Sequence, residues 1–61
     1  MSEVLFEERA GKTPRGGDRS VVYYKDAKMN PVDKSKATSV EVVEYRGDKV
    51  VGRTYADINQ E

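Results

Sequence analysis

Residues 38–56 read TSVEVVEYRGDKVVGRTYA, and this stretch decides the fold. Two runs rich in Val and Tyr flank Gly47-Asp48, and a glycine at the first central position is what a type II′ hairpin turn requires. The predicted pairs are Tyr45 with Val50, Val43 with Gly52, and Val40 with Tyr55. Because the alternation of apolar residues is imperfect, we expect a β-bulge near Val42-Val43 that puts Val40, Val43 and Tyr45 on one face.

Two further strands precede this hairpin. Residues 19–25, RSVVYYK, are β-branched and aromatic, which is typical of a strand that is contacted on both faces. Residues 3–9, EVLFEER, have a short apolar centre between charges and predict an edge strand. The fold class is therefore all-β: a small antiparallel meander of three or four strands, either an open sheet or a small barrel.

Long polar loops separate the strands. Residues 10–18, AGKTPRGGD, contain three glycines and a proline, and residues 26–39, DAKMNPVDKSKATS, are rich in lysine around Asn30-Pro31. We expect both loops to be flexible and residues 57–61 to form a tail. The chain has 61 residues and predicts one small domain, 1–61, without an internal repeat.

The apolar inventory is small for a domain that folds alone. Val, Ile, Leu and Phe together number 12, and a chain of this size buries only about 60% of the surface that its unfolded form exposes. Small domains are commonly supported by disulfides, a metal or self-association. The chain has no Cys and no His, so self-association is the expected support, and we predict neither a metal nor a cofactor.

Several classes of function are disfavoured by composition. No stretch approaches the roughly 20 apolar residues that span a bilayer, and the first residues do not resemble a signal peptide. We therefore expect a cytoplasmic protein that makes no membrane contact. Without His or Cys, the usual base near neutral pH and the best nucleophile are missing, so we expect no enzyme and assign no catalytic residue.

Charge is balanced overall but unevenly placed. Residues 9–36 carry eight Lys and Arg against three Asp, although the net charge of the chain is zero. Cations interleaved with aromatic residues are typical of surfaces that bind single-stranded nucleic acid. An alternative function is therefore a small nucleic-acid-binding β domain that uses the basic loops 11–19 and 25–36. Its candidate residues are Lys12, Arg15, Arg19, Tyr23, Lys25 and Lys28.

The leading hypothesis is a non-enzymatic protein-interaction or regulatory module that acts through an exposed edge or face of its sheet. The partner is another protein or a second copy of the chain, in a homodimer. Aromatic residues dominate contact energies, so the candidate partner-binding residues are Tyr24, Tyr45 and Tyr55. A third hypothesis is a regulator that orders fully only on its partner.

Overall fold

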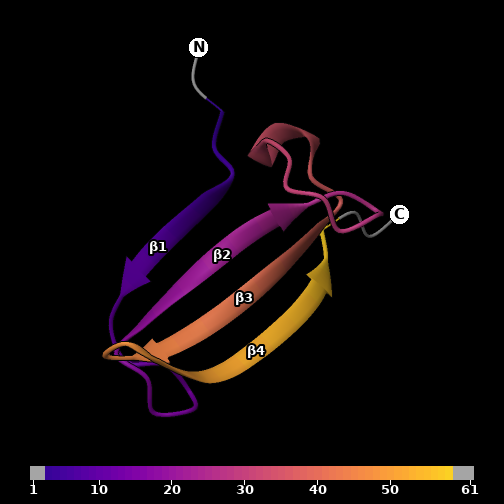
Figure 1. Cartoon of the computed structure of the whole chain (residues 1–61). Coiled ribbons are helices and arrows are strands. Elements are labelled where there is room, and N and C mark those ends of the chain that lie inside the picture. Colours follow the sequence, from indigo (N-terminus) through magenta and orange to yellow (C-terminus); the bar gives the residue numbers. More distant parts are fainter. Residues whose placement is uncertain (1–2, 59–61) are drawn as a thin grey trace.

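The computed structural model describes residues 3–58, and in it the chain forms one open antiparallel sheet (Figure 1). The strands are β1 (Phe6–Ala10), β2 (Arg19–Lys25), β3 (Ser39–Arg46) and β4 (Lys49–Asp57), and a short 3₁₀ helix, η1 (Lys34–Lys36), lies between β2 and β3. Their order in the sheet is β1-β2-β3-β4, so the predicted all-β meander is confirmed and the sheet is open rather than a barrel. β1 and β4 are its two edges.

The β3–β4 hairpin forms around the predicted turn. Arg46 pairs with Lys49, and Gly47 has a φ of 63°. Asp48 is not among the described residues with positive φ. Positive φ at the first central residue alone is the pattern of a type II′ turn, and Gly adopts it without steric cost.

The register of this hairpin differs from the prediction after its first pair. Tyr45 pairs with Val50 as predicted, but Val43 pairs with Arg53 and Val40 with Ala56. The irregularity lies between Glu44 and Tyr45, where Val51 is the extra residue of β4. The bulge predicted at Val42-Val43 is therefore wrong, and Val40 faces the side of the sheet opposite to Val43.

Alternation along the strands divides the sheet into two faces. The tyrosine face carries Phe6, Tyr23, Tyr45 and Tyr55, and the loop face carries Glu7, Tyr24, Val42 and Glu44. Val21 and Val43, which are 5% and 3% exposed, form a directly opposed pair on the tyrosine face. Tyr24 is the remaining buried apolar residue among residues 3–58, so the core is only a few side chains on each face.

The connection from β1 to β2, residues 11–18, folds over the loop face. The amide of Gly17 donates to Thr13 Oγ1 at 2.8 Å, and the amide of Asp18 donates to the carbonyl of Tyr45 at 2.8 Å. Arg15 reaches the buried Glu44, with its amide 3.3 Å from Oε1 and its guanidinium 3.8 Å from Oε2. These bonds attach the glycine-rich segment to β3.

The connection from β2 to β3, residues 26–38, lies at the other end of the sheet (Figure 1). Asp26 Oδ1 accepts bonds from the amides of Lys28 and Asn30 at 2.8 and 2.9 Å, which closes a turn. Asp33 Oδ1 accepts from the amide of Val4 at 2.7 Å and so ties this loop to the segment before β1. From this loop, the Lys34 side chain lies over the sheet, with Nζ 5.9 Å from the centre of the Tyr24 ring.

The end of the chain extends β4 further than the sequence predicts. Asp57, which begins the predicted tail 57–61, is the last residue of β4, and the amide of Ile58 donates to the carbonyl of Thr38 at 3.0 Å. The rest of that tail, 59–61, lies outside the described residues. Within residues 3–58, no helix has the length and apolar character needed to cross a membrane.

Candidate interaction surfaces

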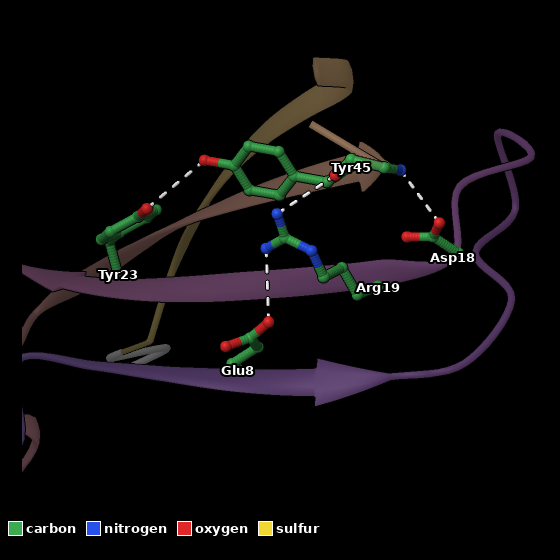
Figure 2. A network of polar contacts seen from close by, with 6 residues as sticks. Glu8, Asp18, Arg19, Tyr23 and Tyr45 are labelled. Carbon is green, nitrogen blue, oxygen red and sulfur yellow. Dashed lines mark hydrogen bonds and ion pairs between the residues drawn. The ribbon is translucent and has the colours of Figure 1, made fainter. Parts of the chain in front are cut away.

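The tyrosine face is built around the Val21–Val43 pair. Tyr23 and Tyr45 lie on either side of this pair along β2 and β3, and their hydroxyl oxygens are 3.5 Å apart (Figure 2). The ring of Phe6 on β1 lies 5.9 Å from that of Tyr23, in a tilted arrangement. The contact between the two hydroxyls is the largest cause of the raised pKa of Tyr23, because it favours the protonated phenol, and desolvation adds to it. These aromatic side chains thus cover the Val21–Val43 pair, as a second layer of helices or strands covers the core of a larger protein.

Arg19 joins three parts of this face (Figure 2). Its guanidinium carbon lies 4.3 Å from the centre of the Tyr45 ring, which is a cation–π contact. Nη1 lies 3.3 Å from Glu8 Oε2 on β1, and Nη2 donates to the carbonyl of Gly47 at 3.2 Å. The charge of Arg19 is therefore shared between a carboxylate, a carbonyl and a ring of the same chain.

A second ion pair lies beside the β4 edge. Arg53 Nε is 3.1 Å from Glu41 Oε2, and the Glu41 side chain is only 17% exposed. Tyr55, opposite Glu41 in the register, is 58% exposed. Because acidic and basic side chains alternate here, the tyrosine face carries no strong charge of either sign.

The outer edge of β4 can be read from the hydrogen-bond pattern. Antiparallel strands alternate between hydrogen-bonded and non-hydrogen-bonded pairs. The bond from the Ile58 amide to the Thr38 carbonyl continues the β3–β4 register, so Gly52, Thr54 and Ala56 direct their backbone groups toward β3. The alternating residues on the outer side of the strand are Arg53, Tyr55 and Asp57.

A second hydrogen bond supports the same assignment from the opposite side of the sheet. The amide of Tyr24 donates to the carbonyl of Leu5 at 3.0 Å, in register with β1–β2. Hydrogen-bonded and non-hydrogen-bonded pairs alternate along β2 and β3 as well. Followed from Tyr24 through these two strands to β4, the alternation again turns the backbone groups of Thr54 toward β3 and those of Tyr55 toward the outer side. Arg15 Nη1 donates to the carbonyl of Arg53 at 3.4 Å, as expected for a carbonyl that is turned away from β3.

The loop face contains a separate polar cluster around Tyr24. The Tyr24 hydroxyl donates to Glu7 Oε1 at 2.5 Å, and Lys34 Nζ lies 3.4 Å from the same oxygen. The hydrogen bond from Tyr24 is the largest cause of the lowered pKa of Glu7, and Lys34 adds to the effect. The same bond raises the pKa of Tyr24, because its hydroxyl must stay protonated to donate.

Hollows formed by residues 3–58 lie on the sheet at two places. One, of about 290 Å³, lies against the loop face between residues 11–14 and the strands, with Arg9 and Lys12 in its lining together with the carboxylate of Glu44. The other is a groove of about 490 Å³ at the C-terminal end of β4, which includes Met29, Tyr55 and Ala56. Of the two, the groove is the one with residues of β4 in its lining.

The structure brings some of the predicted partner-binding residues together and separates others. Tyr45 and Tyr55 share the tyrosine face, Tyr45 half-buried and Tyr55 exposed. Tyr24 lies on the loop face and is 7% exposed, so it does not join them. The sequence did not predict Arg53 and Asp57, which lie on either side of Tyr55 along the outer edge of β4. Each is two residues from Tyr55, so both turn their backbone groups to the same side of the strand as Tyr55 once the strand is known.

The residues predicted to bind nucleic acid do not form one surface. Arg19, Tyr23 and Lys25 share the tyrosine face, where Lys25 Nζ lies 5.8 Å from the centre of the Tyr23 ring. Lys12 and Arg15 belong to the loop over the other face, and Lys28 lies in the connection at the far end of the sheet. Glu8 and Glu41 stand among the cations of the tyrosine face.

No group of three carboxylates within residues 3–58 is arranged to hold a metal ion. In comparisons with known protein families, curated proteins and solved structures, the chain matches none of them. Any proposal about its function therefore rests on the geometry of these surfaces.

Proposed function

We propose that this protein is a non-enzymatic interaction module that binds another chain by strand addition at the outer edge of β4, with a second copy of itself as the first partner. The observation that carries the proposal is the edge itself. β4 has nine residues, is the longest strand, and no other strand of the described residues pairs with its outer side. An added strand gains backbone hydrogen bonds there, and neighbouring side chains provide selectivity.

The small core favours association, because apolar side chains stay exposed on the single chain. Exposed apolar side chains include Val50, Tyr55 and Ile58, all on or directly after β4, with exposed fractions of 50%, 58% and 44%. Burying apolar surface contributes roughly 25 cal/mol for each Å² removed from water. A partner along β4 would cover part of this surface.

The test uses proline at an outward-facing position. In the Tyr55→Pro variant, the outward amide of the edge is removed while the ladder to β3 is kept, since proline is tolerated where the amide faces solvent. We expect wild-type protein to show a mass that rises toward the dimer with concentration in sedimentation equilibrium. Tyr55→Pro should remain a folded monomer by circular dichroism and sedimentation.

Two further variants separate the amide from the side chain. Tyr55→Ala keeps the outward amide and loses only the ring, so it should associate more strongly than Tyr55→Pro. Thr54→Pro removes an inward amide and should unfold the sheet. A wild-type protein that stays monomeric at all concentrations, or a Tyr55→Pro variant that dimerises as well as wild type, would refute the proposal.

A second candidate function is binding of single-stranded nucleic acid on the tyrosine face. The placement of Arg19, Tyr23 and Lys25 on one face, with Tyr45 beside them, favours it. Binding through phosphates must weaken steeply as salt rises. Absence of a fluorescence anisotropy change with labelled single-stranded DNA or RNA at low salt would remove this candidate.

A further inference from the structure

We infer that two copies pair their β4 strands antiparallel in one register, centred on Tyr55, which places Arg53 of each copy opposite Asp57 of the other. The inference rests on the proposed self-association and specifies its geometry. The result is a continuous sheet of eight strands related by a two-fold axis perpendicular to the sheet, as expected for a closed dimer whose two partners use the same surface.

The hydrogen-bond pattern leaves few registers. A strand added to β4 must bond to the outward residues Arg53, Tyr55 and Asp57, so these residues must form the hydrogen-bonded pairs with their counterparts. The carbonyl of Arg53 already accepts the 3.4 Å bond from Arg15, but a carbonyl has a second lone pair that can accept a bond from the added strand.

Charge selects among the registers that remain. Centring the axis on Arg53 or on Asp57 sets like charges directly opposite each other, which is destabilising. Centring it on Thr54 sets Arg53 opposite Tyr55, and centring it on Ala56 sets Tyr55 opposite Asp57. Among the three outward residues Arg53, Tyr55 and Asp57, only the axis through Tyr55 pairs opposite charges, Arg53 with Asp57 in two places, and it also sets the two exposed Tyr55 side chains against each other.

The electrostatic setting of Arg53 fits this register. Its side chain is 53% exposed although Nε already lies 3.1 Å from Glu41, so the remaining guanidinium donors are open to a second carboxylate. Asp57 of the second copy would then complete a row of carboxylate, guanidinium and carboxylate across the tyrosine face. Such charge-assisted bonds are stronger than neutral ones.

The test is a charge exchange between two variants. Arg53→Asp and Asp57→Arg each turn both opposite-charge pairs of the homodimer into like-charge pairs, and each should weaken association about ten-fold or more. Mixed together, the two variants should associate nearly as tightly as wild type, because every pair in the heterodimer is again of opposite charge. The measurement is sedimentation velocity of each variant and of their equimolar mixture.

Arg9→Asp provides the matched control, since it makes the same charge change on β1 at the opposite edge. It should leave the dissociation constant within about two-fold of the wild-type value. Circular dichroism of each variant checks folding, which matters for Arg53→Asp because the new carboxylate stands beside Glu41.

A measurement on wild-type protein makes the test independent of any variant. In a dimer of one labelled and one unlabelled copy, this register sets Thr54 opposite Ala56 of the partner as a non-hydrogen-bonded pair, whose α-protons lie close together. We expect an intermolecular nuclear Overhauser effect between them. A wild-type dimer without this signal, or variants that associate alone as well as in mixture, would overturn the register while leaving the proposed function intact, whereas a monomeric wild type would overturn both.

Discussion

Gly17 offers the sharpest test of how the glycine-rich loop is attached to the sheet. The residue is buried, and a Cβ added to it would lie 2.6 Å from the carbonyl oxygen of Tyr45 and 2.8 Å from Thr13 Oγ1. The Tyr45 carbonyl is backbone of β3 and accepts the 2.8 Å bond from Asp18, so it cannot retreat without loss of that bond. The Gly17→Ala variant should therefore displace the loop from the sheet.

The expected cost follows from the steric clash. Forcing a methyl group into a site without room costs typically about 1–3 kcal/mol. For a domain of this size, each kcal/mol lowers the melting temperature by roughly 4–8 °C. Thermal unfolding followed by circular dichroism, with urea unfolding as a second probe, measures both quantities.

Gly52→Ala is the matched control. Its Cβ would also meet close atoms, at 2.5 and 2.6 Å, but these belong to the Arg15 side chain, which is 49% exposed and can move aside. The variant then loses the 3.8 Å pair of the Arg15 guanidinium with Glu44 and the 3.4 Å bond from Arg15 Nη1 to the Arg53 carbonyl, each worth about 1 kcal/mol or less. Both substitutions reduce the entropy of the unfolded chain alike, so their difference isolates the clash. A Gly17→Ala protein that melts like wild type, or like Gly52→Ala, would show that the loop does not pack as described.

Three further predictions concern single side chains. Val43 is 3% exposed, and Val43→Ala should lower the free energy of unfolding in urea by about 2 kcal/mol. Val50 is 50% exposed, and Val50→Ala should lower it by less than about 0.5 kcal/mol. Equal effects of the two variants would contradict the assigned core. The pKa of Tyr24 lies above its ordinary value of 10.0 in the folded state, so the stabilisation from its bond to Glu7 is present below pH 10 and is lost as the pH rises through the folded-state pKa. Tyr24→Phe should lack this part of the alkaline loss, and identical alkaline profiles of the two proteins would count against the bond. The pKa of Asp33 is lowered from 3.8 to about 2, first by the hydrogen bond from the Ser35 hydroxyl and then by those from backbone amides, so its stabilisation is present above pH 3.8 and fades as the pH falls toward 2. Asp33→Asn should be less stable than wild type at pH 7, and the gap between their urea midpoints should narrow steadily as the pH falls from about 4 through 2. A gap of constant size over this range would argue against this role.

The meander could be predicted because its signals are local. Gly47 marks the turn and valines mark the strands beside it, and both signals depend on neighbours in the sequence. The bulge could not be placed, because a one-residue shift reverses every side chain of a strand and alternation alone does not show where it occurs. Val51 is the extra residue because the turn fixes the pair of Tyr45 with Val50, while the rest of β4 follows the register set farther along β3.

The candidate surfaces were predicted less completely for a related reason. The neighbouring Tyr23 and Tyr24 had to face opposite sides, but which of them lies under a loop depends on distant contacts such as that of Lys34 with Glu7. The outer edge of β4 was not identified because the predicted register was shifted beyond its first pair. Once the register is known, the period of two along Arg53, Tyr55 and Asp57 follows directly from strand geometry.

The meander order β1-β2-β3-β4 also has a consequence for the kinetics of folding. Each strand pairs only with its neighbours in the chain, so closing the two-residue turn at Gly47 and Asp48 costs less entropy than closing residues 26–38 between β2 and β3. We therefore expect the β3–β4 hairpin to form first and to serve as the template to which the other two strands are added. Substitutions that strain the Gly47 turn should slow folding, whereas substitutions in β1 should mainly accelerate unfolding, and stopped-flow chevron plots of the two classes distinguish these outcomes. On this route β4 is already present as an edge while the last strand is still being added, so a second copy can meet it before either chain has finished folding.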